Sequence, residues 1–216
     1  MFVGRRMTRN LITVTPDTSI LKTKNLLKEY SIDQIPVVEG RKLVGIITDK
    51  DIRDNSASPA STLSIHELNY LLSEMKVREI MTKKLYTVSP GTTIEEATKL
   101  INEKRVNSLP VVVGDELFGI ITTCDLLNVL LDFMGMDTPS SRVELMLSND
   151  MGEIAKIAGI INKLGLTIMS IVSTTNREKG DTRIAVIRVN TDDITELSKV
   201  FEESGYKMTM EYKIEQ

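Results

Sequence analysis

The sequence predicts an α+β protein in which one small unit occurs twice and a different unit follows. Three observations predict this class: a duplication with a spacing of 74 residues, apolar runs that alternate with helical periodicity inside each copy, and a change of pattern after about residue 140. The length of 216 residues suits one large domain or two to three small ones, and 41% apolar with 26% charged residues is the ordinary balance of a folded protein.

The duplication runs from Met7 to Ile52. Shifted by 74 positions, Met7–Pro16 falls on Met81–Pro90, and the register then continues without a gap. About 20 of the 46 aligned positions are identical, which is more than shared propensity would produce. A unit this small cannot bury both faces of its own sheet, so we expect the two copies to pack together.

Each copy is predicted to form a strand, a helix, two strands and a second helix. In the first copy the first strand ends at Pro16, and the helix after it places Ile20 and Leu27 on one apolar face. Two apolar runs around Gly40 predict buried strands joined by a tight turn, and helical spacing returns after Thr48. The second copy repeats these signals at Pro90, Ile94, Ala97, Ile101, Gly114 and Thr122.

Two further helices are predicted beside the second copy. The segment Asn55–Thr62 is a loop by composition, and Ser64 with Glu67 forms a capping box that begins a linker helix. This linker helix carries an apolar stripe at Leu68, Leu71, Leu72 and Met75. The helix after Asp125 is apolar on nearly every side over residues 126–134, so we expect it to be buried all round in a subunit or domain interface.

The segment 141–216 follows another pattern. Alternation over Val143–Leu147 predicts a strand, and residues 154–164 form an amphipathic helix ended by Gly165. Two strands, a helix ended by Gly205 and a last strand buried on one face complete the unit; their ranges are Ile168–Ser173, Ile184–Val189, Ile194–Phe201 and Tyr206–Ile214. The order βαββαβ is that of a ferredoxin-like sandwich.

Scarce residues exclude several kinds of chemistry. A single cysteine, Cys124, excludes an intrachain disulfide and a Cys-cluster metal site, and a single histidine, His66, excludes a His-rich zinc site. The net charge of -3 gives no sign of nucleic-acid binding, and no apolar run suits a membrane span or a secretory signal, so we expect a cytoplasmic protein. The short motifs of nucleotide hydrolases, dinucleotide-binding enzymes and serine hydrolases are missing, so we expect no enzyme.

The two copies resemble CBS domains. The resemblance rests on a Pro-Val-Val strand and a Gly-Ile-Ile-Thr-x-x-Asp motif, which occur at Pro36–Val38 with Gly45–Asp51 and again at Pro110–Val112 with Gly119–Asp125. Two such copies in tandem resemble a Bateman module over roughly residues 1–134.

The C-terminal unit resembles an ACT domain, with Asn149–Gly152 in place of that family's D-x-x-G turn but without its usual proline. The whole combination is similar to acetoin-utilization regulatory proteins of the AcuB type. It implies a first CBS domain at 1–62, a linker helix with the second CBS domain at 63–136, and an ACT-like domain at 141–216.

The residues that follow the second apolar run of each copy suit an adenosine ligand. Asp51 and Asp125, each three residues after a strand-terminal threonine, can accept hydrogen bonds from the vicinal hydroxyls of a ribose. The threonine hydroxyl and the helix N-terminal amides suit a phosphate, and the short apolar strands offer a slot for a flat base. AMP, ADP, ATP or a related adenosyl ligand meets these demands; a Mg²⁺ ion accompanying its phosphates stays an open alternative.

The CBS resemblance further implies two clefts, each combining the Thr and Asp of one copy with the h-x-x-x-P segment of the other. The first cleft then uses Thr48, Lys50, Asp51, Val106, Asn107, Ser108 and Pro110. The second uses Thr122, Asp125, Ile32, Asp33, Gln34 and Pro36. Asp33 would repel a phosphate, whereas Lys50, Lys84 and Arg105 offer cations to the first cleft. We therefore expect the Asp51 cleft to be the better nucleotide site.

Simpler roles stay open beside these. Asp51 and Asp125 could serve only as helix caps, His66 is expected to be a solvated surface residue, and Cys124 an inert small residue. The turn Asp150-Met151-Gly152 could bind an amino acid, as in some ACT domains, or only cap a helix, and capping is slightly favoured.

The sequence thus predicts a regulatory protein that senses an adenine nucleotide and acts on a partner enzyme. The alternative is an amino-acid sensor in which Asp150, Met151 and Gly152 hold the ligand and the CBS pair is a dimerisation scaffold. Both versions predict a two-fold homodimer. Neither needs a cofactor, a nucleic acid or a membrane.

Overall fold

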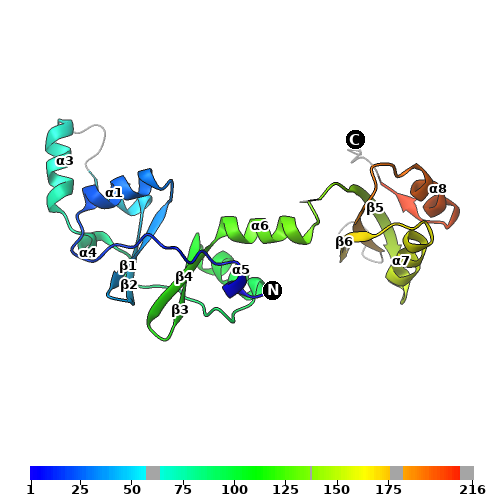
Figure 1. Cartoon of the computed structure of the whole chain (residues 1–216), viewed down its shortest axis with the longest axis horizontal. Coiled ribbons are helices and arrows are strands. Elements are labelled where there is room, and N and C mark those ends of the chain that lie inside the picture. The colour runs from blue at the N-terminus through cyan, green and yellow to red at the C-terminus, as the bar shows by residue number, and fades with distance from the viewer. Residues whose placement is uncertain (57–63, 137, 176–181, 210–216) are drawn as a thin grey trace. The chain divides into compact units, whose positions relative to one another are not determined.

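The computed structural model describes residues 1–56, 64–136, 138–175 and 182–209. The chain divides into two compact units, Met1–Leu126 and Leu127–Gln216, each containing helices and one four-stranded sheet (Figure 1). The mixed content confirms the predicted α+β class.

In the first unit each copy contributes a helix, a β-hairpin and a second helix. The elements of the first copy are α1 (Ile20–Glu29), β1 (Gln34–Glu39), β2 (Lys42–Thr48) and α2 (Asp49–Asp54). Those of the second copy are α5 (Ile94–Lys104), β3 (Ser108–Val113), β4 (Glu116–Thr122) and the start of α6 (Thr123–Phe133), a helix that continues into the second unit. Gly40 and Gly114 occupy the two hairpin turns with φ of +62° and +61°, a conformation that tight hairpins demand. The strand order β1-β2-β4-β3 joins the two hairpins into one sheet.

The strand predicted before each proline is reduced to a single bridge. The Val14 N–H donates to the Pro36 carbonyl at 3.2 Å, and the Val38 N–H donates to the Val14 carbonyl at 2.9 Å. The next bond along this parallel ladder would need an N–H at Pro16, which has none. In the second copy Val88 pairs with Val111 in an equivalent single bridge, and Pro90, two residues later, ends the pairing in the same way.

The two copies exchange their first segments. Residues 1–8, which include the short 3-10 helix η1 (Val3–Arg5), lie against the second copy, where Thr8 and Ile120 share two backbone hydrogen bonds of 2.9 and 3.0 Å. Residues 75–82, which include α4 (Val77–Ile80), lie against the first copy, where Thr82 and Ile46 share the equivalent pair. The prediction that the copies pack together is therefore correct, and each copy completes the other.

The linker helix is α3 (Ile65–Glu74), and it begins at the predicted capping box. The Ser64 hydroxyl accepts from the Glu67 N–H at 3.3 Å, and the Glu67 carboxylate accepts from the Ser64 N–H at 2.7 Å. Leu72 is buried in the core of the first copy, with Leu68 and Met75 packed against it, but Leu71 is half-exposed, so its inclusion in the apolar docking stripe was wrong. Residues 57–62 of the predicted loop lie outside the described residues.

The second unit contains β5 (Ser141–Ser148), α7 (Glu153–Lys163), β6 (Ile168–Thr175), β7 (Thr182–Val189), α8 (Thr195–Glu203) and β8 (Lys207–Met208). Its strands form one antiparallel sheet in the order β6-β7-β5-β8. Alternate residues of β5 and β7 are buried with the inner faces of the two helices, around Phe201 and Ile157. The predicted connection at 176–181 and the end of the last predicted strand, at 210–214, lie outside the described residues.

The burial expected for the helix at 126–134 is only half present. Leu126 and Val129 are buried, but Leu127, Leu130 and Leu131 are each about half-exposed. The chain itself therefore covers one face of α6 only, and the subunit or domain interface expected over the rest of this helix stays a prediction. Across the described parts of the chain, no helix combines the length and the apolar character that crossing a bilayer requires.

Candidate functional site

A groove of about 730 Å³ opens in the first unit and is lined by both copies. Most lining residues of the first copy have their counterpart, 74 positions later, in the lining as well. Such pairs include Ile12 with Tyr86, Ile32 with Val106, Asp33 with Asn107, Gln34 with Ser108, Pro36 with Pro110 and Thr48 with Thr122. The groove thus follows the symmetry of the duplication.

The groove contains nearly all the predicted nucleotide-binding residues. Thr48, Lys50, Asp51 and the segment from Val106 to Ser108 with Pro110 all line it. From the second predicted set, Ile32, Asp33, Gln34, Pro36 and Thr122 line it, and Asp125 does not. The two predicted sets therefore meet in one continuous groove, and the two aspartates differ in their access to it.

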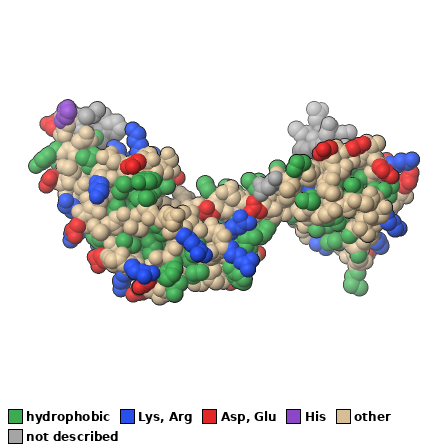
Figure 2. All heavy atoms as spheres, viewed as in Figure 1, with side chains coloured by type: hydrophobic (Ala, Val, Ile, Leu, Met, Phe, Trp, Pro, Cys, Tyr) green, Lys and Arg blue, Asp and Glu red, His purple; other side chains and the backbone are tan. Residues whose placement is uncertain are grey.

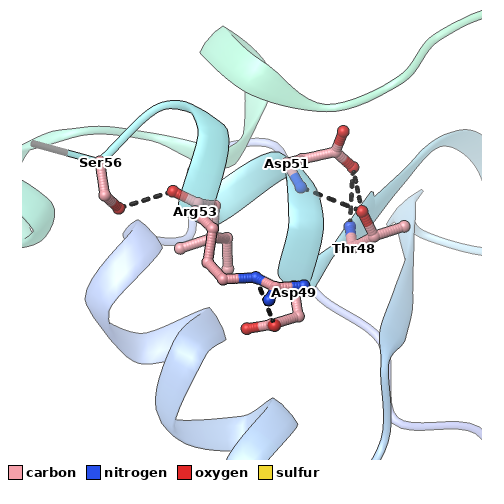
Figure 3. Close-up of polar contacts among 6 residues, drawn as sticks. Thr48, Asp49, Asp51, Arg53 and Ser56 are labelled. Carbon is pink, nitrogen blue, oxygen red and sulfur yellow. Dashed lines mark hydrogen bonds and ion pairs between the residues drawn. The ribbon is translucent and has the colours of Figure 1, made fainter. Parts of the chain in front are cut away.

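Asp51 is held by Thr48 at the start of α2 (Figure 3). One carboxylate oxygen, Oδ2, accepts from the Thr48 N–H at 2.9 Å and from the Thr48 hydroxyl at 2.7 Å, while the Asp51 N–H donates back to that hydroxyl at 3.1 Å. The other carboxylate oxygen points away from these bonds in Figure 3. Asp51 therefore does cap α2, the simpler role that the sequence left open. The cap uses only one of its two carboxylate oxygens.

Asp125 repeats this geometry at the start of α6. Its Oδ2 accepts from the Thr122 N–H at 2.7 Å and from the Thr122 hydroxyl at 2.8 Å. The Asp125 N–H completes the box at 3.2 Å. Because the two aspartates make the same capping bonds, their different access to the groove comes from the residues around them.

At the centre of the groove the two copies touch through equivalent side chains. The Ser108 hydroxyl donates to the Gln34 side-chain oxygen at 2.7 Å. Ser108 is buried and Gln34 is partly buried, so this bond lies where the halves of the groove meet. The NH₂ group of Gln34 remains a donor for anything that enters.

The positive charge of the groove comes from side chains more than from a helix end. Helix α2 has only six residues, and two of its first three amides are already bonded: Asp49 N–H to the Asp33 carbonyl at 2.9 Å, and Asp51 N–H to Thr48. Arg53 pairs with Asp49 at 3.0 Å. Lys50, Lys84 and Arg105 are exposed and line the groove, so these three can meet an anion.

Sequence reasoning missed an apolar part of the lining. Leu11, Ile12, Leu85 and Tyr86 line the groove from the segments that precede Val14 and Val88. The Lys104 ammonium lies 5.4 Å from the centre of the Tyr86 ring. The sequence did carry a signal for these residues. They come directly before the same dipeptide in both copies, Thr13-Val14 and Thr87-Val88, and so occupy equivalent positions.

A smaller hollow of about 530 Å³ lies in the second unit around the turn Asp150-Met151-Gly152. The turn leads into α7 and supplies its N-cap, Gly152, whose φ of +88° suits glycine; the slightly favoured capping role therefore falls to the backbone of Gly152. The Asp150 side chain takes no part in it and accepts from the Ser148 hydroxyl at 2.8 Å. Arg183 lines the same hollow. Nearby, burial and the Glu153 carboxylate raise the pKa of Tyr206, and the same carboxylate raises the pKa of Lys156.

Within the described residues, no group of three or more His, Cys, Asp or Glu side chains is arranged to hold a metal ion. His66 is exposed on α3, as expected, and Cys124 is exposed at the groove.

Among known proteins, the chain is 37% identical over 118 residues to inosine-5'-monophosphate dehydrogenase of Korarchaeum cryptofilum. This match covers 54% of the chain and only 22% of the length of that enzyme. A similar solved structure is CBSX2, a CBS-pair protein of Arabidopsis thaliana, with 31% identity, a TM-score of 0.50, and coverage of 60% of this chain and 94% of that one. CBSX2 has also been solved in complex with AMP.

A second similar structure is an acetoin utilization protein (AcuB) of Vibrio cholerae. It is 26% identical with a TM-score of 0.52, and the match covers 64% of this chain and 98% of that one. The profile of the CBS domain matches residues 3–58 and 77–132, which together make up more than half of the sequence. These two matches coincide with the duplicated copies and enclose the groove, so the chain belongs to the CBS-domain family.

Proposed function

We propose that this chain is a regulatory protein that senses an adenine nucleotide in the groove of its CBS pair. The observation that carries the proposal is Asp51: one carboxylate oxygen is fixed by Thr48, and the other is left for a ligand at the groove wall. A carboxylate held this way accepts hydrogen bonds from two vicinal hydroxyls without losing side-chain entropy on binding.

Three other features support an adenosine ligand. Leu11, Leu85 and Tyr86 offer apolar and aromatic surface to a base, and Lys50, Lys84 and Arg105 offer cations to phosphates. The AMP complex of CBSX2, a 31% identical CBS pair, shows that a relative takes this kind of ligand. Because Asp51 lines the groove and Asp125 does not, we propose that the ribose binds at Asp51.

Calorimetry with AMP, ADP and ATP tests the proposal. We expect Asp51→Asn to weaken binding at least about 10-fold, the loss of one charge-assisted hydrogen bond, since asparagine can still cap α2. Asp125→Asn is the matched control, because it makes the same change in an identical capping box. Titrating ATP with and without Mg²⁺ shows whether the ion accompanies the phosphates.

Two outcomes would contradict this assignment. Absence of binding by the wild-type chain to all three nucleotides and to S-adenosylmethionine would remove the nucleotide function. Equal losses in the two variants would remove the preference for Asp51.

A second candidate function is amino-acid sensing in the second unit. It is favoured by the hollow that places Asp150 and Arg183 in one lining, a carboxylate for an ammonium group and a guanidinium for a carboxylate. We propose that residues 141–216 form an ACT-like domain of ferredoxin-like topology, supported by the element order and by the strand order β6-β7-β5-β8. Calorimetry with the twenty amino acids, on wild-type protein and Arg183→Gln, separates this function from nucleotide binding.

The wider proposal follows the domain plan drawn from the sequence. CBS domains at 1–62 and 63–136 would bind the nucleotide, and the unit at 141–216 would pass the signal to a partner enzyme in the cytoplasm, with acetoin utilization as one candidate process. The chain itself would have no catalytic activity. A homodimer is part of the proposal and is supported by the apolar residues that α6 leaves exposed.

A further inference from the structure

Four helices of this chain, α1, α5, α7 and α8, end in the same backbone turn. In each turn an N–H donates to the carbonyl five residues earlier, which ties the end of the helix to the segment that follows. The four bonds run from Ile32 to Leu27 at 3.0 Å, Val106 to Ile101 at 3.2 Å, Leu166 to Ile161 at 3.2 Å and Tyr206 to Phe201 at 2.9 Å. The residue just before each donor has a left-handed backbone, with φ between +51° and +83°. Glycine is the residue that takes this conformation without strain.

The four turns differ in the residue at this left-handed position. It is glycine after α7 and α8, at Gly165 and Gly205, but Ser31 after α1 and Arg105 after α5. Among the described residues, Ser31 and Arg105 are the two residues other than glycine with a positive φ. They are equivalent in the duplication, and both line the groove. The chain thus keeps a side chain on strained backbone at the two turns that border the groove, which indicates a use for that side chain there.

No contact within the described chain explains the arginine at position 105. Its side chain is exposed and makes no hydrogen bond or ion pair with another residue that the structure describes. Lys and Arg side chains are scattered over the face of the first unit that Figure 2 shows, so exposure alone marks no site. Arg105 is distinguished by an unpaired guanidinium that is kept on strained backbone at the wall of a groove.

The duplication shows that the cations of the groove form one set and not two symmetric sets. Three exposed cations line the groove without an ion-pair partner among the described residues, and their counterparts 74 positions away line it too but carry no charge. The pairs are Lys50 with Cys124, Lys84 with Asn10, and Arg105 with Ser31. We therefore expect one phosphate-bearing ligand in each chain.

We propose that Arg105 is the residue by which the groove distinguishes a phosphorylated nucleotide from its bare nucleoside. This inference deepens the proposed function and rests on it, since it needs an adenine nucleotide in the groove. Asp51 is assigned to the ribose, which nucleotide and nucleoside share, so it does not tell them apart. A guanidinium binds a phosphate through two parallel hydrogen bonds, whereas the ammonium groups of Lys50 and Lys84 act as point charges. Arg105 therefore adds a geometric fit to phosphate, and the strained backbone is its cost in stability.

A simpler role for this arginine makes the opposite prediction for stability. A cation at the C-terminal end of a helix interacts favourably with the helix dipole, and Arg105 follows the last residue of α5. If that were its role, replacing Arg105 with glycine would destabilise the first unit. If the arginine is kept for a ligand, the same replacement relieves the strain and stabilises the first unit.

Calorimetry of the full chain with AMP, ADP, ATP and adenosine tests the role in binding. We expect Arg105→Gly to weaken binding of the tightest nucleotide at least about 10-fold, the loss of charge-assisted hydrogen bonds, and to change adenosine binding less than about 2-fold. Arg105→Lys keeps the charge without the planar fork, so it should show a smaller loss than Arg105→Gly. Lys99→Gln removes a cation from α5 outside the groove lining and should bind all four ligands as wild type does.

Differential scanning calorimetry without ligand tests the cost in stability. We expect Arg105→Gly to raise the melting temperature of the first unit by about 2 °C, because glycine relieves the left-handed backbone. Ser31→Gly is the matched control: it makes the same backbone change in the equivalent turn without removing a charge. It should raise the melting temperature in the same way and leave the ratio of nucleotide to adenosine affinity at its wild-type value.

The outcomes separate this inference from the proposed function. Unchanged nucleotide binding by Arg105→Gly would overturn this inference alone, as would equal losses for the nucleotide and adenosine. A lower melting temperature for Arg105→Gly would also overturn it, because the arginine would then serve the end of α5. A wild type that binds none of the nucleotides would overturn the proposed function, and this inference with it.

Discussion

Gly45 and Gly119 occupy equivalent places in the two copies, and each lies against the methionine of an exchanged segment. A Cβ at Gly45 would lie 2.6 Å from Met81 Sδ, and the nearest backbone atom, the Thr82 carbonyl oxygen, would be 3.3 Å away. A Cβ at Gly119 would lie 2.6 Å from Met7 Sδ and 2.9 Å from the Thr8 carbonyl oxygen. The first clash can be relieved by a flexible side chain, and the second involves backbone.

We therefore expect Gly119→Ala to destabilise the first unit by about 2–3 kcal/mol and Gly45→Ala by about 1 kcal/mol, measured by urea unfolding. In a Met81→Ala background, Gly45→Ala should lower the free energy of unfolding only slightly, because the closest clashing side chain is gone. Adding Met7→Ala to Gly119→Ala should recover less, because the Thr8 carbonyl remains. If Gly45→Ala and Gly119→Ala lowered the free energy of unfolding equally, the Thr8 backbone would be able to move away from Gly119 without loss of stability.

Single residues were predictable where the duplication presented them twice. Thr48, Asp51 and their counterparts stand out because the same spacing recurs 74 residues later. The bond between Ser108 and Gln34 could not be predicted, because it depends on how the two hairpins approach. The apolar contribution of Tyr86 was missed although Ile12 occupies the equivalent position in the first copy, because the repeat marks these two positions without telling which groove they border.

Capping boxes show how short motifs set the ends of elements in this chain. Helix α5 begins at Thr93, whose hydroxyl accepts from the Glu96 N–H at 3.2 Å. The Glu96 carboxylate accepts from the Thr93 N–H at 3.0 Å and from its hydroxyl at 2.9 Å. The backbone N–H of Thr93, and then its hydroxyl, lower the pKa of Glu96 below its ordinary value.

This lowered pKa predicts a pH-dependent effect of Glu96→Gln. A carboxylate whose pKa is lower in the folded state contributes stability that is fully present above its unfolded value, about 4.3, and is lost as the pH falls through the folded value. The stability difference between wild type and Glu96→Gln should thus be constant above about pH 5 and shrink below about pH 4.

Urea unfolding of wild type and Glu96→Gln from pH 3 to pH 7 measures this difference in the free energy of unfolding. Glu95→Gln, on the same first turn but outside the capping box, is the control for the loss of one negative charge from this turn. A difference between wild type and Glu96→Gln that grows on acidification would contradict the role assigned to the carboxylate.

The periodicity of the sequence predicted which elements are helices and which are strands. The length and burial of each element depended on its neighbours in the fold. The two hairpins and their glycine turns were predictable because the turn residues and the apolar runs agree. The first strand of each copy was overestimated, because Pro16 and Pro90 stop a ladder that the apolar pattern alone would continue. Helix α6 was expected to be buried on all sides because hydropathy shows what needs cover and not whether the same chain provides it.

At the scale of the molecule, the two units have separate cores. One cluster of buried residues includes Ile20, Ile47 and Leu72 and lies wholly within the first unit. Another includes Leu145 and Phe201 and lies wholly within the second. The exchange of segments 1–8 and 75–82 ties the two CBS copies to each other through backbone hydrogen bonds, so we expect these two copies to unfold together.

Differential scanning calorimetry of the full chain should therefore resolve two transitions, one for each unit. AMP at 100 times its dissociation constant should stabilise only the unit with the groove, by about 2.7 kcal/mol, because a ligand stabilises the part of the protein that it binds. An amino acid bound beside Asp150 should move only the other transition. Asp51→Asn should reduce the AMP shift and leave the second transition in place. A single transition, or two transitions that AMP raises equally, would mean that the two units fold as one cooperative body.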